Sequence, residues 1–365
     1  MKVLSVYVKP TNFCNIDCDH CYLPEEVRAN KKTISFDELR KAYGFVKDVA
    51  IRENFDDIHF IWHGGEPMML EPEWYEEAHK IADEVFGERQ YGTSIQTSLI
   101  RYSSKWNNLI NDRWDSFVGS SIDFSSRTIR SSTDSYIDLW MKRVNKAREA
   151  GITVIPGFVP SKNEIGKEKE IVSWFIENGF EAFNFERYTN FLNKPDFNYP
   201  SNKEHSLFMI SLFDELMRMM EEDGSAPDVK PIYAAIRGVK DKVSGDRWGT
   251  NCQSSFIIIE PNGDINTCPD RSSVEKPFSN IKDGADAFLN SKSRRKWIRM
   301  SVVKHKGEHC LNCEYNTWCK SGCPINPNKP FDPKVADCSG HKLFLNHVKQ
   351  FLNSEKGEIA VKYIS

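Results

Sequence analysis

Shortly after an apolar run at residues 3–9, VLSVYVK, the chain reads Cys14-Asn15-Ile16-Asp17-Cys18-Asp19-His20-Cys21. The apolar run predicts a strand, so one tight loop at its end can present all three thiols to a single cluster. Iron–sulfur clusters normally take four cysteines, and a three-thiolate set leaves one iron open to bind a substrate or cofactor. A structural zinc site completed by His20, or a coincidence of thiols, is the alternative interpretation.

The first half of the chain repeats one unit, a short apolar run joined to a longer amphipathic stretch. The predicted strands are residues 3–9, 57–62, 93–97, 117–123, 153–159 and 182–188. The predicted helices are residues 35–52, 73–85, 103–111, 134–150 and 164–178, and Ser35 with Glu38 forms a capping box at the start of the first. Six such units predict a parallel sheet, either open or closed into a full or partial barrel, with its chemistry at the strand C-termini.

A helix at residues 206–222 is followed by a plausible domain boundary at residues 222–227. Residues 255–260 and 264–267 then predict a β-hairpin with Asn262-Gly263 at its turn, which would bring together Cys252 and Cys268. The stretch from Cys310 to Cys338 is poor in core residues, so we expect metal clusters to hold it.

Composition narrows the function further. The chain has 365 residues, 39% of them hydrophobic, which excludes a mainly disordered protein. Its net charge of −3 gives no basic field for nucleic acid, and no stretch approaches the roughly 18 apolar residues of a membrane span. We therefore expect no nucleic-acid partner, no membrane and a cytoplasmic location. Ten cysteines in such a chain favour metal or redox chemistry over disulfides, and their division into three early and seven late thiols predicts separate sites.

The C-x3-C-x2-C loop, with Tyr22 just beyond it, resembles the signature of the radical S-adenosylmethionine (SAM) enzymes. The resemblance implies a partial barrel of six βα units and a [4Fe–4S] cluster whose open iron binds SAM. Reductive cleavage of SAM then yields a 5′-deoxyadenosyl radical that abstracts hydrogen from the substrate. One departure is His20, where many members have an aromatic residue. The implied cluster ligands are Cys14, Cys18 and Cys21.

Gly64-Gly65-Glu66-Pro67, after the second predicted strand, is similar to the GGEP motif of the same family. The resemblance implies that Gly64 and Gly65 let the backbone approach the methionine end of SAM, and that Glu66 meets its ammonium group. A plain turn is the alternative interpretation.

Polar residues that end two further predicted strands fall where similar enzymes contact SAM. Ser121 and Asp123 correspond to contacts with the SAM carboxylate and ribose, and Gln96 with Thr97 lines the neighbouring strand. Phe124 follows where relatives usually have glycine, which puts the local shape in doubt. We list Tyr22, Gln96, Ser121 and Asp123 with the GGEP residues as expected SAM contacts.

The seven late cysteines, with Gly263 in its C-x10-G-x4-C context, resemble the SPASM extension of radical SAM enzymes, which holds two auxiliary clusters. The family pattern assigns Cys310, Cys313, Cys319 and Cys338 to the distal cluster. It assigns Cys252, Cys268 and Cys323 to the cluster nearer the barrel, which therefore lacks a fourth cysteine. The fourth coordination site of that cluster is empty, takes a side chain such as Asp270, or binds substrate. A zinc-ribbon-like domain is the alternative.

The predicted architecture is therefore α/β: a partial (β/α)6 TIM-like barrel at residues 1–225, a linker at 226–248 and a small iron–sulfur SPASM domain at 249–365. It would hold SAM and three [4Fe–4S] clusters, one binding SAM and two auxiliary. Auxiliary clusters suit a net oxidation of the substrate. When the substrate has lost a hydrogen atom and then a proton, it holds one excess electron, which an auxiliary cluster can accept. Asp270 is the candidate base. In the related anaerobic sulfatase-maturating enzymes an Asp directly follows the equivalent cysteine, whereas here Pro269 intervenes, and an exposed turn Asp is the alternative.

Radical SAM/SPASM enzymes mostly modify peptides or proteins, so we expect oxidation or oxidative crosslinking of a residue in such a substrate. Only 13 residues precede Cys14 and 27 follow Cys338, which leaves no room for a winged-helix recognition domain. A leader peptide would then bind the barrel itself or a separate carrier protein. We also expect a reductant such as flavodoxin or ferredoxin. The alternatives are a small-molecule dehydrogenase or tailoring enzyme, and a non-enzymatic iron–sulfur carrier or redox sensor.

Overall fold

The computed structural model describes the whole chain except residues 1, 190–195, 250, 304–307 and 326–336. Its contacts divide it into two compact units. The first contains residues 1–122, 126–155 and 251–298, and the second contains residues 123–125, 156–250 and 299–365. In the part of the chain that the structure describes, no helix has the length and apolarity that a membrane crossing needs.

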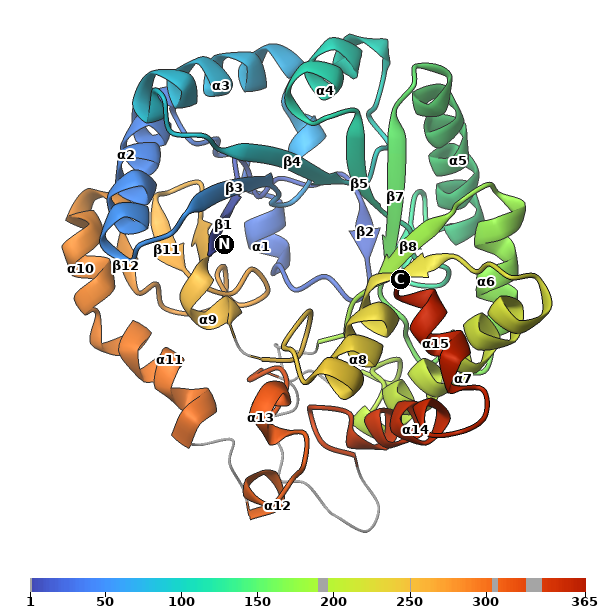
Figure 1. Ribbon diagram of the computed structural model, residues 1–365. Helices are drawn as coiled ribbons and strands as arrows, with labels where there is room; N and C mark the ends of the chain where they lie inside the picture. The colour runs from blue at the N-terminus through green and yellow to red at the C-terminus, as the bar shows by residue number, and fades with distance from the viewer. Residues whose placement is uncertain (1, 190–195, 250, 304–307, 326–336) are drawn as a thin grey trace. The chain divides into compact units, whose positions relative to one another are not determined.

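The first unit is built on a sheet whose central strand is β1 (Val3–Val8). On one side β1 pairs in parallel with β3 (Asp57–Trp62), which is followed by β4 (Gly92–Thr97) and β5 (Phe117–Ser121). On its other side β1 pairs in parallel with β10 (Phe256–Ile259), which forms a hairpin with β11 (Asp264–Asn266), itself paired with β12 (Ser279–Asn280). The late-sequence hairpin therefore extends the sheet that carries the first cysteine loop (Figure 1).

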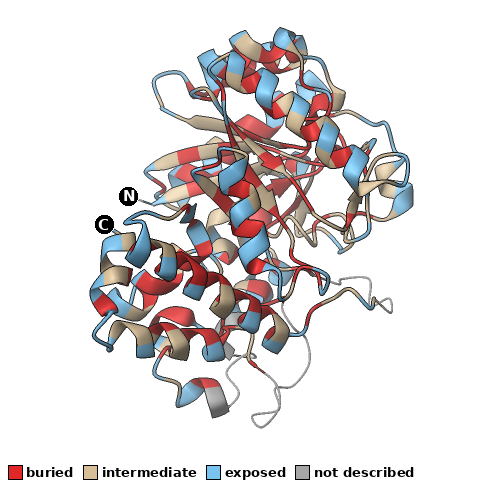
Figure 2. Cartoon of the chain, turned by 90° about the vertical axis from the view of Figure 1, so that its right-hand side faces the viewer, coloured by how far each residue is buried: buried red, intermediate tan, exposed pale blue. Residues whose placement is uncertain are grey.

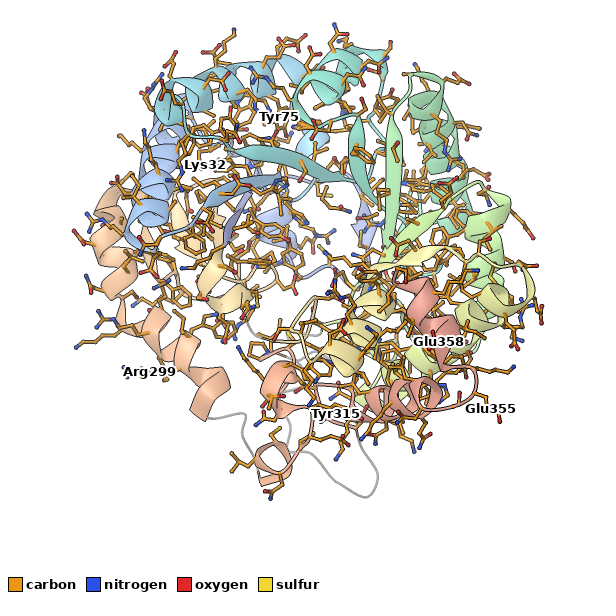
Figure 3. The ribbon with its side chains drawn as sticks, viewed as in Figure 1. Lys32, Tyr75, Arg299, Tyr315, Glu355 and Glu358 are labelled. Carbon is orange, nitrogen blue, oxygen red and sulfur yellow. The ribbon has the colours of Figure 1, made fainter. Side chains whose placement is uncertain are left out.

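Amphipathic helices cover this sheet because each buries one apolar stripe. The long ones are α2 (Phe36–Arg52), α3 (Pro72–Phe86) and α5 (Thr133–Glu149), and α4 (Asn107–Arg113) is shorter. The predicted capping box at Ser35 is present, with Glu38 completing it. Figure 2 shows buried positions concentrated on the strands and on one side of the helices. Tyr75, on α3, is fully buried against Trp62 of β3, and its position beside that helix can be followed in Figure 3.

Shorter elements complete the first unit. A two-stranded ribbon pairs β2 (Asp17–Cys18) with β6 (Arg127–Thr128). The remaining short helices are α1 (Glu25–Arg28), η1 (Pro67–Met69), η2 (Ser104–Trp106), α9 (Cys252–Ser255), η3 (Ile281–Asp283) and α10 (Gly284–Asn290). Helix α11 (Lys292–Val303) follows them in the chain.

The second unit contains parallel strands and a group of helices. β7 (Thr153–Phe158), β8 (Ala182–Phe185) and β9 (Asp228–Val229) pair in that order. Its longer helices are α6 (Glu168–Glu177), α7 (Asn202–Glu222), α8 (Lys230–Asp241) and α14 (Lys342–Leu352). Its shorter ones are α12 (Glu308–Leu311), α13 (Asn316–Cys319) and α15 (Gly357–Tyr363). Its core is apolar, with Phe208 and Phe213 of α7 fully buried.

Each of the six predicted strands is present, and the antiparallel hairpin is confirmed. The predicted helix boundaries were less accurate. The helix expected from residue 164 begins at Glu168, and the one expected from residue 206 begins at Asn202. The sequence-based domain boundaries at 225 and 249 stay a prediction, since compactness groups residues 251–298 with the first unit.

Candidate functional site

The three early thiols lie on one loop beyond β1, and backbone hydrogen bonds fix that loop along its length. Cys14 N donates to Arg28 O at 3.3 Å, and Cys21 N donates to Cys18 O at 3.1 Å. Between them, Cys18 lies in β2, paired across the ribbon with Arg127. The loop is therefore shaped by its own backbone as well as by any cluster that it binds.

Electrostatics within this loop match a set of cluster ligands. The pKa of the Cys14 thiol is raised to about 11, chiefly by burial and also by the charges of Glu66 and Cys21, against the opposing effects of the Ile16 hydrogen bond and the charge of Arg127. A thiolate is the form that binds metal, and a bound cation removes the penalty of ionising a buried thiol. Cys18 and Cys21 share the loop with Cys14, and a set of three neighbouring thiols fits an iron–sulfur cluster. His20, the fourth ligand of the zinc alternative, has its Nδ1 2.9 Å from Ser126 Oγ.

The Gly64-Gly65 turn packs against the segment that leads into the cysteine loop. A Cβ on Gly64, whose φ is +130°, would lie 2.3 Å from Thr11 O, and one on Gly65 would lie 2.2 Å from Asn12 O. Gly65 N also donates to Thr11 O at 3.2 Å. The two glycines are thus required by the close approach of this backbone, which braces the cysteine loop. Their contact with SAM stays a prediction.

Glu66 is buried and held by donors from two directions. Its Oε2 accepts from Ser98 N at 2.7 Å, and its Oε1 accepts from Met68 N at 2.9 Å and from the Thr97 hydroxyl. The structure therefore brings together the GGEP turn and the end of β4, as expected for residues at one edge of a parallel sheet.

The other expected SAM contacts are distributed over both units. Gln96 Nε2 donates to Ser121 Oγ at 3.0 Å, which joins two of them at the ends of β4 and β5. Asp123 belongs to the second unit, where its buried carboxylate accepts from Val159 N at 2.8 Å. Binding of SAM by these residues stays a prediction.

Tyr22 connects the first cysteine loop with the segment after the hairpin. Its hydroxyl is buried and has no hydrogen-bond partner among the residues that the structure describes. Burial raises its pKa well above the usual value, and the charges of Asp270, Cys21, Glu260 and Cys268 raise it further. Because these charges act on one hydroxyl, residues from both cysteine-bearing segments lie around it.

Asp270 and Cys252 also interact in the first unit. Burial raises the pKa of the Asp270 carboxyl to about 6, against the opposing charge of Lys9. Burial raises the pKa of Cys252 to about 11, and the charge of Asp270 contributes to that rise. Asp270 therefore lies within electrostatic reach of Cys252, and it follows Cys268 by two residues in the chain. Its role as base or ligand stays a prediction.

A buried polar cluster beside these residues was missed by the sequence analysis. Lys9 is fully buried, and its Nζ lies 2.9 Å from Glu260 Oε1 and 2.7 Å from Ser272 Oγ. Lys9 and Glu260 are each the first residue after an apolar strand and carry opposite charges, but neither segment by itself indicates that the two residues pair. Only the parallel pairing of Val8 with Ile259 shows that the two residues are neighbours.

In the second unit, the four thiols assigned to the distal cluster interact with one another. Burial raises the pKa of Cys319 far above the usual value, and the charges of Cys338, Cys313 and Cys310 raise it further. Cys323, assigned to the other set, exerts its charge on Arg187. The family pattern assigns the same four thiols to one cluster. Tyr315, which lies between them in the chain and is labelled in Figure 3, is buried, and its ring contacts that of Trp318.

The donor sets can be compared with the two metal alternatives. Within the described ranges, no group of three or more His, Cys, Asp or Glu residues is arranged to hold a single metal ion. In an iron–sulfur cubane each thiolate binds a different iron, so its ligands need not converge on one point.

Comparison with known proteins extends these observations. Residues 8–172 match the family model described as the radical SAM superfamily. The chain is 22% identical to the serine-type anaerobic sulfatase-maturating enzyme of Bacteroides thetaiotaomicron over 414 residues, covering 98% of this chain and 92% of that enzyme.

Two solved structures are similar in fold. Native anSMEcpe with bound AdoMet and Cp18Cys peptide superposes with a TM-score of 0.78 at 17% identity, covering 98% of this chain and 99% of that one. Streptococcus suis SuiB bound to its precursor peptide SuiA superposes with a TM-score of 0.58 at 16% identity, covering 88% of this chain and 72% of that one. The predicted α/β partial barrel is confirmed by the first of these matches.

Proposed function

We propose that this chain, whose residues 8–172 match the radical SAM superfamily model, is a radical SAM/SPASM oxidoreductase that oxidises or oxidatively crosslinks a residue of a peptide or protein substrate. The observation that carries the proposal is the environment of Tyr22. Tyr22 directly follows Cys21, and Lys9 Nζ lies 5.1 Å from the centre of its ring while donating to Pro269 O at 3.4 Å in the segment after Cys268. Similarity over nearly the full chain to a sulfatase-maturating enzyme and to a peptide-bound structure supports the substrate class.

Different residues of the chain are proposed to bind the cofactors and to take up the proton. Cys14, Cys18 and Cys21 are proposed to hold the cluster that binds SAM, with Glu66 toward the SAM ammonium. When bound, SAM and its cluster supply a carbon-centred radical that removes a hydrogen atom from the substrate. Asp270 is proposed to take the proton that must also leave, or to complete the inner auxiliary site.

The seven late thiols are proposed to hold two auxiliary clusters, which would accept the remaining electron. The distal set is Cys310, Cys313, Cys319 and Cys338, and the nearer set is Cys252, Cys268 and Cys323. Three [4Fe–4S] clusters, a flavodoxin- or ferredoxin-type reductant, a peptide-carrier protein and a cytoplasmic location belong to the same proposal.

The test is anaerobic. The reconstituted protein is assayed for iron, sulfide and 5′-deoxyadenosine release, with the triple variant Cys14→Ala/Cys18→Ala/Cys21→Ala as control. We expect about three clusters' worth of iron in the wild type, about one fewer in the variant, and SAM cleavage only in the wild type. Zinc in place of iron, or no SAM cleavage by fully loaded protein, would overturn the assignment.

Substrate class is tested separately with peptides encoded beside the gene and with synthetic peptides that carry one Cys, Ser or aromatic residue. We expect loss of two hydrogen atoms or a crosslink by mass spectrometry, and transfer of deuterium from a labelled side chain into 5′-deoxyadenosine. Turnover of sugar or aminocyclitol alcohols with no peptide product would instead establish the small-molecule dehydrogenase.

A further inference from the structure

Lys9 lies at the centre of a buried polar cluster formed by Lys9, Asn12, Glu260, Ser272 and Ser273. Besides Glu260 and Ser272, its ammonium donates to Ser273 Oγ at 3.0 Å and to Pro269 O at 3.4 Å. Its side chain has no exposed surface. A buried lysine is rare unless it is paired, so this arrangement needs a physical reason.

Glu260 is bound from two sides by residues far apart in the sequence. Asn12 Nδ2 donates to Glu260 Oε2 at 2.9 Å, while Ser273 Oγ at 3.0 Å and the Ser272 hydroxyl donate to Oε1. Burial raises the pKa of Glu260, but the charge of Lys9 and the hydrogen bonds from Asn12, Lys9 and Ser272 outweigh it, so the pKa lies below its usual value. The carboxylate is thus kept charged in a buried place.

The residues of this buried polar cluster come from two segments of the first unit, one that leads into Cys14 and one that follows Cys268. Lys9 and Asn12 lead into Cys14, and Lys9 N continues the β1 ladder by donating to Ile259 O at 2.9 Å. On the other side, Ser272 N donates to Cys268 O at 3.1 Å, which closes the turn that contains Asp270. The ion pair therefore joins the turn after Cys268 to the segment before Cys14.

Lys9 also faces the residues that the proposed reaction uses. Its Nζ lies 5.1 Å from the centre of the Tyr22 ring, and its charge acts on Asp270. Breaking one half of a buried ion pair leaves an uncompensated charge, so such pairs strongly constrain the segments that carry them.

We propose that Lys9 and Glu260 are positioning residues, which hold the Cys268–Asp270 turn in register with the Cys14–Cys21 loop and so couple radical formation to substrate oxidation. This inference rests on the proposed function. It adds two residues that touch neither the SAM nor the substrate of that proposal, and it predicts that their loss separates SAM cleavage from product formation.

The test compares Lys9→Met and Glu260→Gln with Arg40→Met, which removes an exposed ion pair to Glu84 in the same unit. In both buried variants we expect SAM cleavage within about twofold of wild type. Product formed per 5′-deoxyadenosine should fall on the order of a hundredfold, since a misplacement of about 1 Å can have that effect. Arg40→Met should match the wild type. Unchanged coupling in both buried variants would overturn the proposal.

A second readout needs no substrate. In the Cys14→Ala/Cys18→Ala/Cys21→Ala background, the electron paramagnetic resonance spectrum of the reduced protein reports the auxiliary clusters alone. Adding Lys9→Met should change the signal of one of the two clusters and lower its stability to chelators, and adding Arg40→Met should not. An unchanged spectrum and chelator stability would count against the positioning role.

If Lys9→Met fails to fold, two milder variants decide the question. Ser273→Ala removes two hydrogen bonds, the one that Ser273 Oγ accepts from Lys9 and the one that it donates to Glu260, and leaves no lone charge, so it should give a smaller spectral change of the same kind. Lys9→Met/Glu260→Met removes both charges and should recover folding without recovering coupling. A wild-type spectrum in Ser273→Ala, or full coupling in the double variant, would overturn the proposal. Absence of any peptide product from the wild type would instead refute the proposed function, with the spectral arm still valid.

Discussion

A Cβ atom added to Gly65 would lie 2.2 Å from the carbonyl oxygen of Asn12, which is closer than a carbon and an oxygen that are not bonded can approach. The GGEP turn and the segment entering the cysteine loop are therefore fitted to each other at the level of the backbone. The glycine has a structural task in this chain that is independent of what the turn binds.

Gly65→Ala should displace residues 12–14 and weaken the first cluster. We expect anaerobically reconstituted Gly65→Ala to lose about one cluster's worth of iron, together with SAM cleavage, while the auxiliary clusters persist. Gly44→Ala, in the middle of α2, is the matched control, because no atom outside the neighbouring helix backbone lies within 4 Å of its added Cβ. It should keep all iron and gain roughly 0.5–1 kcal/mol in helix stability. Full iron in Gly65→Ala would contradict this account.

Gly340 plays a comparable part in the second unit. An added Cβ would lie 2.5 Å from Cys319 Sγ, although the φ of Gly340 is not in the left-handed region. Gly340→Ala should therefore displace one thiol of the distal set, with loss of about one cluster's worth of iron. Gly157→Ala, whose nearest neighbour would be 4.0 Å away, is the control in the same unit. Equal iron in the two variants would show that this contact does not limit cluster binding.

His79 on α3 should make the stability of the fold sensitive to acid. Burial lowers its pKa to about 4, with Arg113 acting in the same direction and Asp83 opposing. The unfolded chain then binds more protons below about pH 6.5, so the contribution is complete above that pH and is lost as the pH falls toward 4. Unfolding free energy should drop by about 2 kcal/mol from this residue between pH 7 and pH 5.

His79→Gln tests that slope by denaturant unfolding under anaerobic conditions. The variant should lose less stability than the wild type between pH 7 and pH 5, whereas the two curves should be parallel between pH 7 and pH 8. Parallel curves over the whole range would mean that His79 is not buried in its neutral form.

Asp270→Asn should separate the two halves of the proposed reaction. The amide keeps the shape of the side chain but cannot take a proton, so we expect 5′-deoxyadenosine release near the wild-type rate and product reduced on the order of a hundredfold or more. Glu275→Gln, an exposed carboxylate nearby that pairs with Arg271, is the control. Undiminished product from Asp270→Asn would remove this residue from the mechanism.

Local patterns allowed the elements to be predicted, and most boundary errors have local causes. The helix at residues 206–222 begins earlier because Ser201 and Glu204 form a capping box that was overlooked. The helix at 164–178 begins later because the Glu164 carboxylate accepts from Ser161 N at 2.8 Å, which closes a turn before Gly166, whose φ is +89°. In both cases a short polar motif, and not the spacing of the apolar residues, decides where the helix begins.

The parts of the candidate site that lie within one short sequence motif could be predicted. The parts that depend on pairing between strands far apart in the chain could not. Cysteine spacing pointed to the first loop, whereas the grouping of the four distal thiols came from the family pattern and stays a prediction, although Cys310, Cys313 and Cys338 all act on Cys319. Lys9 and Glu260 could not be recognised as partners, since their contact depends on parallel pairing between strands about 250 residues apart in the chain. Long-range register of this kind leaves no signature in either segment by itself.

The parallel pairing of β10 with β1 has a consequence for how the chain can be divided. Without residues 251–298, β1 would become an unprotected border strand with the sequence VLSVYV and unsatisfied backbone groups along one side. Such a border recruits other strands, so a fragment that ends at the apparent barrel boundary should precipitate or form intermolecular β-structure. The hairpin of β10 and β11 thus also protects the sheet of the first unit from self-association.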